Sequence, residues 1–280
     1  MRFAFKTAPQ NSTWSDIRSV WLAGDQIELF ESAWTFDHFY PLTQDTSGPC
    51  LEGWITLAAL AEATTRLRLG VLVTGIHYRH PAVLANMAAS LDIVSNGRLE
   101  LGIGAGWNEE ESAAYGIELG TRKQRSDRFE EACQVIVDLL TKEWSDFSGD
   151  YYTITHARSE PKPVQKPHPP ICIGGGGEKR TLRTTARFAQ HWNFGGGELD
   201  VFDHKLAVLR QHCADLGRDP KEITISTHLR LQPGMDPKEL AELAATFAEH
   251  GADLGIVQLP VPYTPTILEP LAQALAQVNQ

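Results

Sequence analysis

The residues best suited to chemistry in this 280-residue sequence lie in four short segments, and the first of them holds an acid beside an imidazole. Asp37 and His38 directly follow a short apolar run at residues 32–36. Such a pair can hold a polar ligand group or move a proton near neutral pH. The alternative is that Asp37 caps a loop and that His38 is a loop histidine with satisfied hydrogen bonds.

The second segment combines a hydroxyl group, a glycine and three side chains that can carry positive charge. Thr74 can contact a ligand through its hydroxyl, and Gly75 allows a ligand to approach the backbone closely. His77, Arg79 and His80 can hold an anion. Alternatively, Arg79 and His80 belong to the solvated start of a helix, because helix starts are normally polar.

The third segment is a set of alternating glycines, Gly102, Gly104 and Gly106, followed by Trp107. They do not complete the dinucleotide-binding pattern, and the acidic residue that should follow that pattern is missing. Three glycines at a strand end leave room for a flat ring. The alternative is close packing of a strand against a helix, which also needs positions without side chains.

The fourth segment is a run of four glycines at residues 174–177, with an apolar strand before it and a helical segment after it. Free backbone N–H groups at such a helix start make a phosphate site. Lys179 and Arg180 add positive charge, and Thr181 adds a hydroxyl. The run is not a P-loop, because the lysine–hydroxyl pair that ends a P-loop is absent. The alternative is a flexible loop.

The elements that must position these segments alternate between short β-rich runs and longer helical runs, which is typical of βα units and a parallel sheet. The predicted strands are residues 2–6, 32–36, 69–73, 99–103, 170–173, 192–194, 223–227 and 254–259. The predicted helices are residues 14–22, 53–65, 81–95, 126–141, 178–189, 200–216, 237–250 and 266–276, with a short helix from residue 108. Eight units of about 35 residues predict an α/β fold, a (β/α)8 TIM barrel, with one domain over residues 1–280.

The regular alternation is interrupted at residues 144–170, where we expect an insertion in the barrel. Residues 146–155 predict a β-hairpin, and residues 160–170 contain five prolines. From its location we expect this insertion to form part of a lid over the barrel mouth. In a barrel of this kind the C-terminal ends of the strands carry the chemistry. All four segments are therefore expected at one rim.

The composition argues against several classes of function. The chain has 42% apolar and 21% charged residues, and 35 acidic against 25 basic residues give a net charge of −10. Such a chain is a poor partner for nucleic acid or an anionic membrane, and it contains no apolar run of 18 residues. Its four separated cysteines predict free thiols and no metal site. Without a signal-peptide pattern at the start, a cytoplasmic location is favoured.

Taken together, the strand ends resemble the luciferase-like monooxygenase superfamily, and within it the oxidoreductases that depend on the deazaflavin coenzyme F-420. The resemblance covers nearly the whole chain. It depends on the order and spacing of several segments, each modest alone, namely residues 34–41, 68–81, 91–98, 101–107, 161–165 and 174–177.

The resemblance implies a bacterial-luciferase-like barrel with a planar cofactor at the C-terminal ends of the strands. It places Asp37 and His38 near the reactive ring. It assigns further cofactor contacts to Leu72, Val73, Thr74, Ala105 and Gly106. It assigns the cofactor phosphate to Gly175, Gly176, Gly177 and Lys179. A non-proline cis peptide is implied at Leu72–Val73, as a backbone bulge that supports one face of the ring.

The reaction that the resemblance implies is hydride transfer between the ring and a small organic substrate, with the protein supplying orientation and electrostatics. His38 is then the proton-handling group or a donor that stabilises negative charge on the ring, and Asp37 is its orienting or cofactor-anchoring neighbour. The family's sugar-phosphate dehydrogenases carry an acid where this chain has Trp107 and a tryptophan where it has Leu42. Sugar-phosphate oxidation is therefore disfavoured, and a more apolar substrate pocket is expected.

Three other functions stay open at this point. An FMN-dependent two-component monooxygenase keeps the fold, and its cofactor also has a flat ring and a phosphate. A non-catalytic cofactor-binding barrel and a non-redox barrel enzyme for a phosphorylated metabolite are the others. The longer acidic tail of the deazaflavin favours a basic track, for which the candidates are Arg79, Lys179, Arg180 and Arg183. Expected partners are a reductase that supplies reduced flavin or deazaflavin, and a second copy of the chain in a homodimer.

Overall fold

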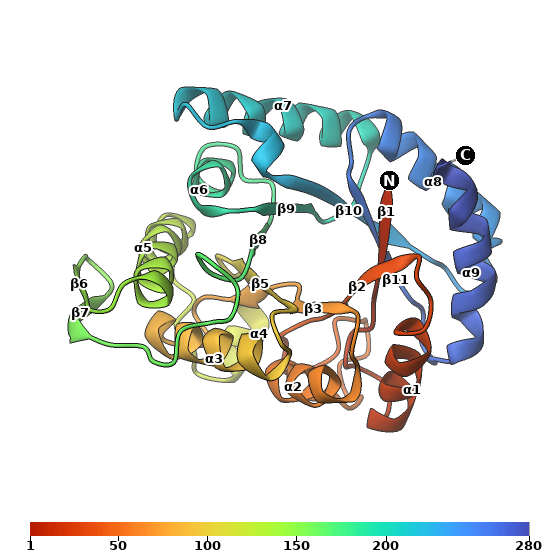
Figure 1. Cartoon of the computed structure of the whole chain (residues 1–280), viewed down its shortest axis with the longest axis horizontal. Helices are drawn as coiled ribbons and strands as arrows, with labels where there is room; N and C mark the ends of the chain where they lie inside the picture. Colours follow the sequence, from red (N-terminus) through yellow and green to blue (C-terminus); the bar gives the residue numbers. More distant parts are fainter. Residues whose placement is uncertain (280) are drawn as a thin grey trace.

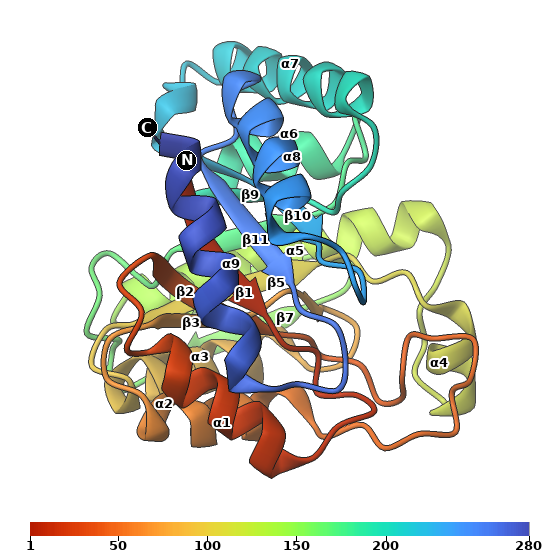
Figure 2. The same cartoon turned by 90° about the vertical axis from the view of Figure 1, so that its right-hand side faces the viewer.

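The chain forms a closed parallel sheet surrounded by helices, seen here in a computed structural model that describes residues 1–279 (Figures 1 and 2). Within those residues the strands of the sheet are β1 (Arg2–Lys6), β2 (Phe30–Thr35), β3 (Arg68–Val71), β4 (Thr74–Gly75), β5 (Leu99–Gly104), β8 (Ile171–Gly174), β9 (His191–Phe194), β10 (Thr224–Arg230) and β11 (Leu254–Gln258). Pairing of β3 with β5 closes the sheet. Since β4 continues β3, these two strands count as one of the eight strand positions around the barrel, which we call staves. The predicted (β/α)8 barrel is thus confirmed.

Helices cover the outside of the sheet, as Figures 1 and 2 show. They are α1 (Trp14–Gly24), α2 (Gly53–Ala63), α3 (Pro81–Val94), α4 (Glu109–Ala114), α5 (Arg122–Thr141), α6 (Thr181–Phe188), α7 (Leu199–Asp215), α8 (Pro237–Glu249) and α9 (Leu268–Leu275). Short 3-10 turns are η1 (Pro220–Glu222), η2 (Pro265–Ile267) and η3 (Ala276–Asn279). Among the helices described, none has the length and apolar character that crossing a membrane requires.

The apolar core lies mainly between the sheet and these helices, because strand residues alternate between the inner and outer faces of the barrel. On the outer side, the Phe5 ring meets the rings of Trp21 and Phe30 edge-on, at centroid distances of 6.0 and 5.4 Å. A smaller group, with Trp34 and Ile256, fills the barrel interior. Full burial of each such side chain is worth roughly 1.5–3 kcal/mol.

The third stave is interrupted by a cis peptide bond between Leu72 and Val73, where neither residue is proline. The cis bond that the family resemblance implies is thus confirmed. The sequence predicted one continuous strand over residues 69–73, whereas the chain leaves the sheet after Val71 and rejoins it at Thr74. The Leu72 amide donates to the Thr35 carbonyl of β2 (3.0 Å), and its carbonyl accepts from Nζ of Lys6 of β1 (3.1 Å). These two contacts hold the bulge from the side of the sheet where β2 and β1 follow β3.

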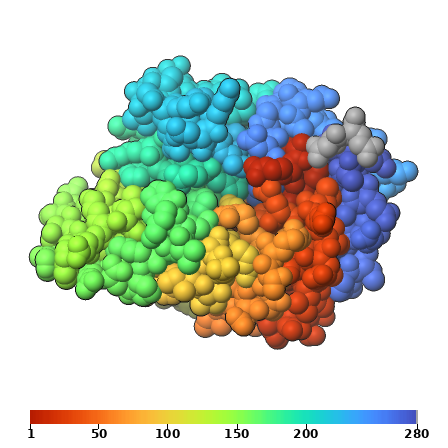
Figure 3. Space-filling view, in the orientation of Figure 1, coloured from red at the N-terminus to blue at the C-terminus, as the bar shows by residue number. Residues whose placement is uncertain are grey.

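The insertion begins with the predicted hairpin, formed by β6 (Ser145–Ser148) and β7 (Thr153–Ala157). It does not form the expected lid. Gln165, in the proline-rich return, hydrogen-bonds to Asp92 and to the Leu99 carbonyl, at the start of β5. Figure 3 shows the green segment on the face where the chain begins, whereas Figure 2 places α4 at the opposite end of the barrel. The proline-rich return therefore lies toward the end of the barrel that carries the strand starts, whereas the hairpin runs along the outside, where the Tyr152 ring meets that of His80 before α3 (centroids 5.2 Å).

Two predicted helix starts are wrong by several residues. Helix α5 begins at Arg122 instead of residue 126, because Thr121 and Gln124 form a reciprocal capping box. Helix α6 begins at Thr181 instead of residue 178. Two residues of α7 bind Glu178 outside the helix: Nε2 of His212 donates to its backbone carbonyl, and Nζ of Lys205 donates to its carboxylate.

Candidate functional site

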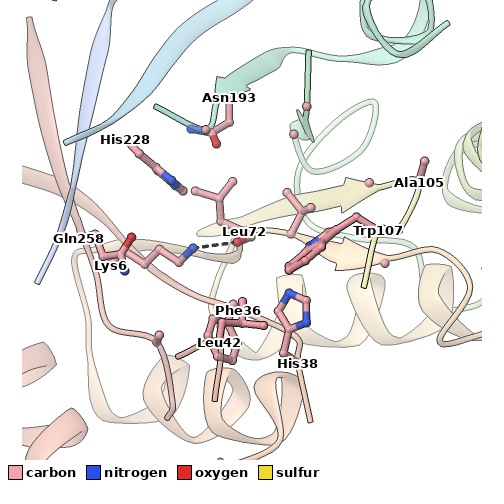
Figure 4. A pocket seen from close by; sticks show the side chains of 18 of the residues that line it. Lys6, Phe36, His38, Leu42, Leu72, Ala105, Trp107, Asn193, His228 and Gln258 are labelled. Carbon is pink, nitrogen blue, oxygen red and sulfur yellow. Dashed lines mark hydrogen bonds between the residues drawn. The ribbon is translucent and has the colours of Figure 1, made fainter. Parts of the chain in front are cut away.

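A cavity of about 610 Å³ opens at the C-terminal ends of the strands and receives residues from all eight staves or the loops that follow them (Figure 4). This volume lies within the range of small-molecule and cofactor sites. The predicted residues that line it are His38, Leu72, Val73, Ala105, Gly106 and Gly175. The predicted residues outside its lining are Asp37, Thr74, Gly176, Gly177 and Lys179.

His38 is held by Glu111, the third residue of α4. Nδ1 of His38 donates to Oε2 of Glu111 at 2.8 Å. Oε1 of the same carboxylate accepts from the Phe39 amide (2.6 Å), and Oε2 also accepts from the Tyr78 hydroxyl. Burial alone would raise the pKa of Glu111, but the hydrogen bonds from His38, Tyr78 and Phe39 lower it. The ionised carboxylate keeps the proton on Nδ1, so Nε2 is the nitrogen of His38 that is free for a ligand.

Aromatic rings surround His38 on the cavity side. Its ring meets the rings of Phe36 and Trp107 edge-on, at centroid distances of 5.1 and 5.6 Å. Trp107 and Leu42, the two residues that differ from the sugar-phosphate dehydrogenases, both line the cavity, and Figure 4 shows them near His38. Trp107 is 61% exposed, so its ring forms part of the cavity mouth.

Asp37 lies behind the cavity wall instead of in it. Its side chain is 1% exposed, and both its oxygens accept from the Arg79 guanidinium. Arg79 also donates to Glu52 at 2.6 Å. Burial raises the pKa of Asp37, and Arg79 offsets part of that rise. Thr74, fully buried, accepts from the Trp54 indole at 2.8 Å. Asp37 therefore braces the second and third staves from behind, and it is Glu111 that contacts His38.

Glycines form the rim of the cavity on the side of β5 and β8. A Cβ atom on Gly104 would lie 2.8 Å from Val73, and a Cβ atom on Gly106, whose φ is +87°, would lie 2.4 Å from Nδ1 of His77. Beyond Gly175 the loop leaves the cavity, and Lys179 is exposed. Of the cations proposed for a basic track, Arg180 pairs with Asp127 and Glu130 of α5.

A second polar wall comes from β1, β10 and β11. It contains Lys6, His228, Arg230 and Gln258, together with Asn193 of β9. Burial, and then the charge of Arg230, lowers the pKa of Lys6 to about 8. Burial, and then the charges of Lys6 and Arg230, lowers the pKa of His228 well below its usual value.

Asn193 is connected to a buried ion pair inside the barrel. Its amide nitrogen donates to the Ser226 hydroxyl (2.9 Å), which also contacts Nε2 of His191 (2.6 Å). Nδ1 of His191 lies 3.0 Å from Glu100, which Arg68 contacts at 2.8 Å. Burial opposes both charges. His191 and then Arg68 lower the pKa of Glu100 to about 2, and Cys172 and then Glu100 raise the pKa of His191 to about 10. The amide oxygen of Asn193 is thereby left for the cavity.

Sequence reasoning missed Glu111, Lys6, His228, Arg230 and Gln258. Glu111 stands in a run of three acids at the start of α4, which resembles ordinary first-turn acidic residues. Lys6 ends the predicted strand 2–6, so the rule that assigned chemistry to strand ends applied to it as well. Arg230 lies three residues beyond the predicted strand 223–227, because β10 continues from Thr224 to Arg230. Within the described residues no group of three or more His, Cys, Asp or Glu side chains is arranged to hold a metal ion.

The lining of the cavity has features of a site for a polar ligand. Its glycine rim leaves part of one side without side chains, while Nδ1 of His77 and Nε2 of His228 are buried without hydrogen-bond partners in the described chain. Unsatisfied buried nitrogens at a cavity indicate a polar ligand. Fold and site together define a (β/α)8 barrel with a ligand site at the strand C-termini.

Comparison with known proteins places the chain in a family. The luciferase-like monooxygenase family model matches residues 10–276. The chain belongs to the luciferase-like monooxygenase family, and the resemblance drawn from the sequence is confirmed. An F420-dependent hydroxymycolic acid dehydrogenase of Mycobacterium tuberculosis is 33% identical over 193 residues, which cover 68% of this chain and 52% of that protein.

Two solved structures have the same fold. One is described as an F420-dependent secondary alcohol dehydrogenase in complex with an F420–acetone adduct; its TM-score is 0.89 at 17% identity, over 100% of this chain and 99% of that chain. The other is the monooxygenase RslO1 from Streptomyces bottropensis, with a TM-score of 0.82 at 19% identity over 100% of both chains.

Proposed function

We propose that this protein is an oxidoreductase that transfers a hydride between a deazaflavin of the coenzyme F-420 type and a small organic substrate. The observation that carries the proposal is the His38–Glu111 pair at the edge of a cavity bounded by the Leu72–Val73 bulge. The F420-dependent relative named above supports this choice of cofactor.

The residues proposed to hold the cofactor lie on one arc of the rim. Leu72 and Val73 would support one ring face, with Ala105 and Gly106 beside them. The phosphate would lie at the loop that leaves the cavity, which contains Gly175, Gly176, Gly177 and Lys179. When bound, the deazaflavin would supply the ring position that gives or accepts the hydride. Thr74 and Asp37 are proposed to act from behind, by fixing the staves that carry the bulge.

His38 is the proposed catalytic acid–base group. Because Glu111 holds the proton of Nδ1, Nε2 can take a proton from, or return it to, a substrate oxygen in the cavity. Trp107 and Leu42 would limit the access of water to that position. The remaining wall, with Lys6 and Asn193, can orient the rest of the substrate.

An FMN-dependent monooxygenase is the second candidate, favoured by the likeness in fold to a monooxygenase. Either cofactor offers a flat ring and a phosphate to the same arc of the rim. A reductase would then supply the reduced cofactor as a partner protein. A barrel that binds the cofactor without turnover is the third candidate, and its cavity would bind the ring but convert no substrate.

Titration of the purified protein with coenzyme F-420 and with FMN, each oxidised and reduced, tests the proposal. Micromolar binding of F-420 with much weaker binding of FMN supports it. Preference for FMN replaces it with the monooxygenase, and binding of neither cofactor overturns the redox assignment. Cofactor binding without substrate-dependent absorbance change across a substrate panel would favour the non-catalytic barrel.

We also propose that the protein is a cytoplasmic homodimer that associates through α2 and α3, which Figure 1 shows side by side. The one charged residue of α3, Asp92, is buried. Ile55 of α2 is 75% exposed, and Val83 and Val94 of α3 are 52% and 55% exposed. A contiguous apolar surface of this kind typically marks an association site. A second copy, presenting the same two helices, would cover it symmetrically.

A further inference from the structure

A row of polar residues crosses three neighbouring strands at the cavity rim. Lys6 of β1 is the register partner of Gln258 of β11, which is in turn the register partner of Arg230 of β10. His228 stands two residues before Arg230 on the same strand and therefore on the same face. All four residues line the cavity, and Figure 4 shows Lys6, Gln258 and His228 on one side of it. We call these four residues the basic row.

The cations of the basic row have no counter-ion. In the part of the chain that the structure describes, neither Lys6 nor Arg230 forms an ion pair, although the chain carries 35 acidic residues. Lys6 is only 7% exposed, and the neutral Leu72 carbonyl is the acceptor of its hydrogen bond. A buried ammonium is costly unless a negative charge compensates it. The positive charge therefore points to an anion that comes from outside the chain.

His228 gives independent support for a ligand at the same place. Its Nε2 is buried and has no hydrogen-bond partner among the described residues. Buried polar atoms are normally paired, so an unpaired one at a cavity surface indicates a missing ligand atom or water. An anion between Lys6 and Arg230 would also offset the two charges that disfavour protonation of His228.

We propose that the basic row binds the carboxylate of an organic acid, and that the substrate of this protein is therefore a small carboxylate with an apolar body. This substrate class rests on the proposed oxidoreductase function. Phe36, Leu42 and Trp107 line the cavity and supply the surface for the apolar body. Lys6 and Arg230 supply the charge, and Gln258 supplies a neutral hydrogen bond.

Within the basic row, His228, Arg230 and Gln258 lie away from the proposed cofactor arc, whereas Lys6 reaches the bulge itself through the Leu72 carbonyl. Around the barrel, β10, β11 and β1 are consecutive, and they lie across from β3, β5 and β8, which carry the bulge and the glycines. A ring on the bulge with its phosphate at Gly175 would leave the basic row facing the ring. The row is thus placed for a substrate group and not for the phosphate of the cofactor.

Binding of benzoate, its neutral analogue benzamide, and phenyl phosphate tests the proposal, measured by calorimetry with and without saturating F-420. The variants are Arg230→Gln and Lys6→Met, with Arg122→Gln as the control for loss of one exposed positive charge elsewhere. We expect benzoate to bind at least about 10-fold more tightly than benzamide, because a charge-assisted hydrogen bond contributes about this much. Each basic-row variant should lose about 10-fold in benzoate affinity and nothing in benzamide affinity, while Arg122→Gln stays unchanged.

Several outcomes would overturn the inference. Equal binding of benzoate and benzamide by the wild type excludes a carboxylate site, and a phenyl phosphate affinity more than 10-fold above that of benzoate reassigns the row to phosphate. If both variants weaken F-420 and leave benzoate unchanged, the row serves the cofactor's acidic tail. If neither F-420 nor FMN binds but benzoate binding depends on the row, the oxidoreductase function fails and the anion site stands.

Discussion

The Glu111 carboxylate lies 2.8 Å from Nδ1 of His38, a residue 73 positions earlier in the chain. The contact joins the loop after β2 to α4, at the C-terminal end of the barrel. An ionised carboxylate at this place fixes both the tautomer and the orientation of the imidazole, in the way that catalytic histidines are commonly held. The chemistry proposed for His38 therefore depends on a residue from another stave.

Replacement of Glu111 by Gln should lower kcat by about 10-fold or more and leave cofactor affinity nearly unchanged, because Glu111 acts through His38. In wild-type protein labelled with ¹⁵N-histidine, the Nδ1–H resonance of His38 should lie strongly downfield, and Glu111→Gln should move it upfield, because an amide oxygen is a weaker acceptor than a carboxylate. Tyr78→Phe is the matched control, since it removes another donor to the same carboxylate and keeps the His38 contact. Equal loss of kcat in both variants would mean that Glu111 has only a structural role.

His38→Ala should lower turnover by at least about 100-fold, the usual contribution of a general acid or base. The measurement is the change in deazaflavin absorbance with a substrate of the wild-type enzyme, accompanied by the Kd for F-420. Cofactor affinity should stay within about threefold, because Leu72, Val73 and the glycine rim are unchanged. Turnover within twofold of the wild type would remove His38 from the mechanism.

The barrel could be predicted from the sequence because each βα unit shows a regular spacing of apolar residues and has turn residues at its ends. The sequence predicted the strand ends as the site because the chemistry of such a barrel lies there, and His38, Gly104 and Gly106 do line the cavity. It could not predict the partner of His38, since Glu111 is local only in the folded barrel. Asp37, the neighbour in sequence, points to Arg79 instead.

The basic row was missed for a related reason. Lys6 ends an ordinary strand in the sequence, and only the parallel register brings it level with Gln258 and Arg230. Helix starts at Arg122 and Thr181 were also misplaced, because a capping box and contacts with α7 decide them. Local sequence patterns thus predict the helices and strands, whereas the residues that form the site depend on how distant elements pair in the fold.

Glu100→Gln should destabilise the protein by about 3–5 kcal/mol at pH 7, because it leaves the buried His191 charge without its partner. Glu31→Gln is the control, since its ion pair with Arg2 is partly exposed and should contribute about 1 kcal/mol or less. Urea unfolding followed by fluorescence measures both. A loss below 1 kcal/mol for Glu100→Gln would show that His191 is neutral in the folded state.

Stability should fall as the pH falls from about 6.5 toward 4, through the effect of His77. Burial, and then the charge of Arg128, lowers the pKa of His77 to about 4. Between these pH values the unfolded chain binds a proton that the folded chain does not, so the free energy of unfolding rises with pH. After allowance for partial exposure, we expect a loss of about 1 kcal/mol between pH 7 and pH 5 from this group.

The variant that checks this pH effect is His77→Phe, which keeps an aromatic ring beside Tyr78 and cannot take up the proton. Its unfolding free energy should change less between pH 7 and pH 5 than that of the wild type. His204→Gln is the control, because that side chain is 60% exposed. Parallel pH profiles for the wild type and His77→Phe would contradict the assignment.

The exposed apolar residues Ile55, Val83 and Val94 on α2 and α3 lead to the last prediction, a dimer that a single charge can break. An aspartate at Ile55 would be desolvated if a second copy covered that position, and two symmetry-related charges would approach each other. We expect wild-type protein to sediment at twice the chain mass at micromolar concentration and Ile55→Asp to sediment as a monomer with unchanged cofactor affinity. Val201→Asp, on α7 at 42% exposure, is the control and should stay dimeric. A wild type that sediments as a monomer, or an Ile55→Asp variant that stays dimeric, would place the association surface elsewhere or remove it.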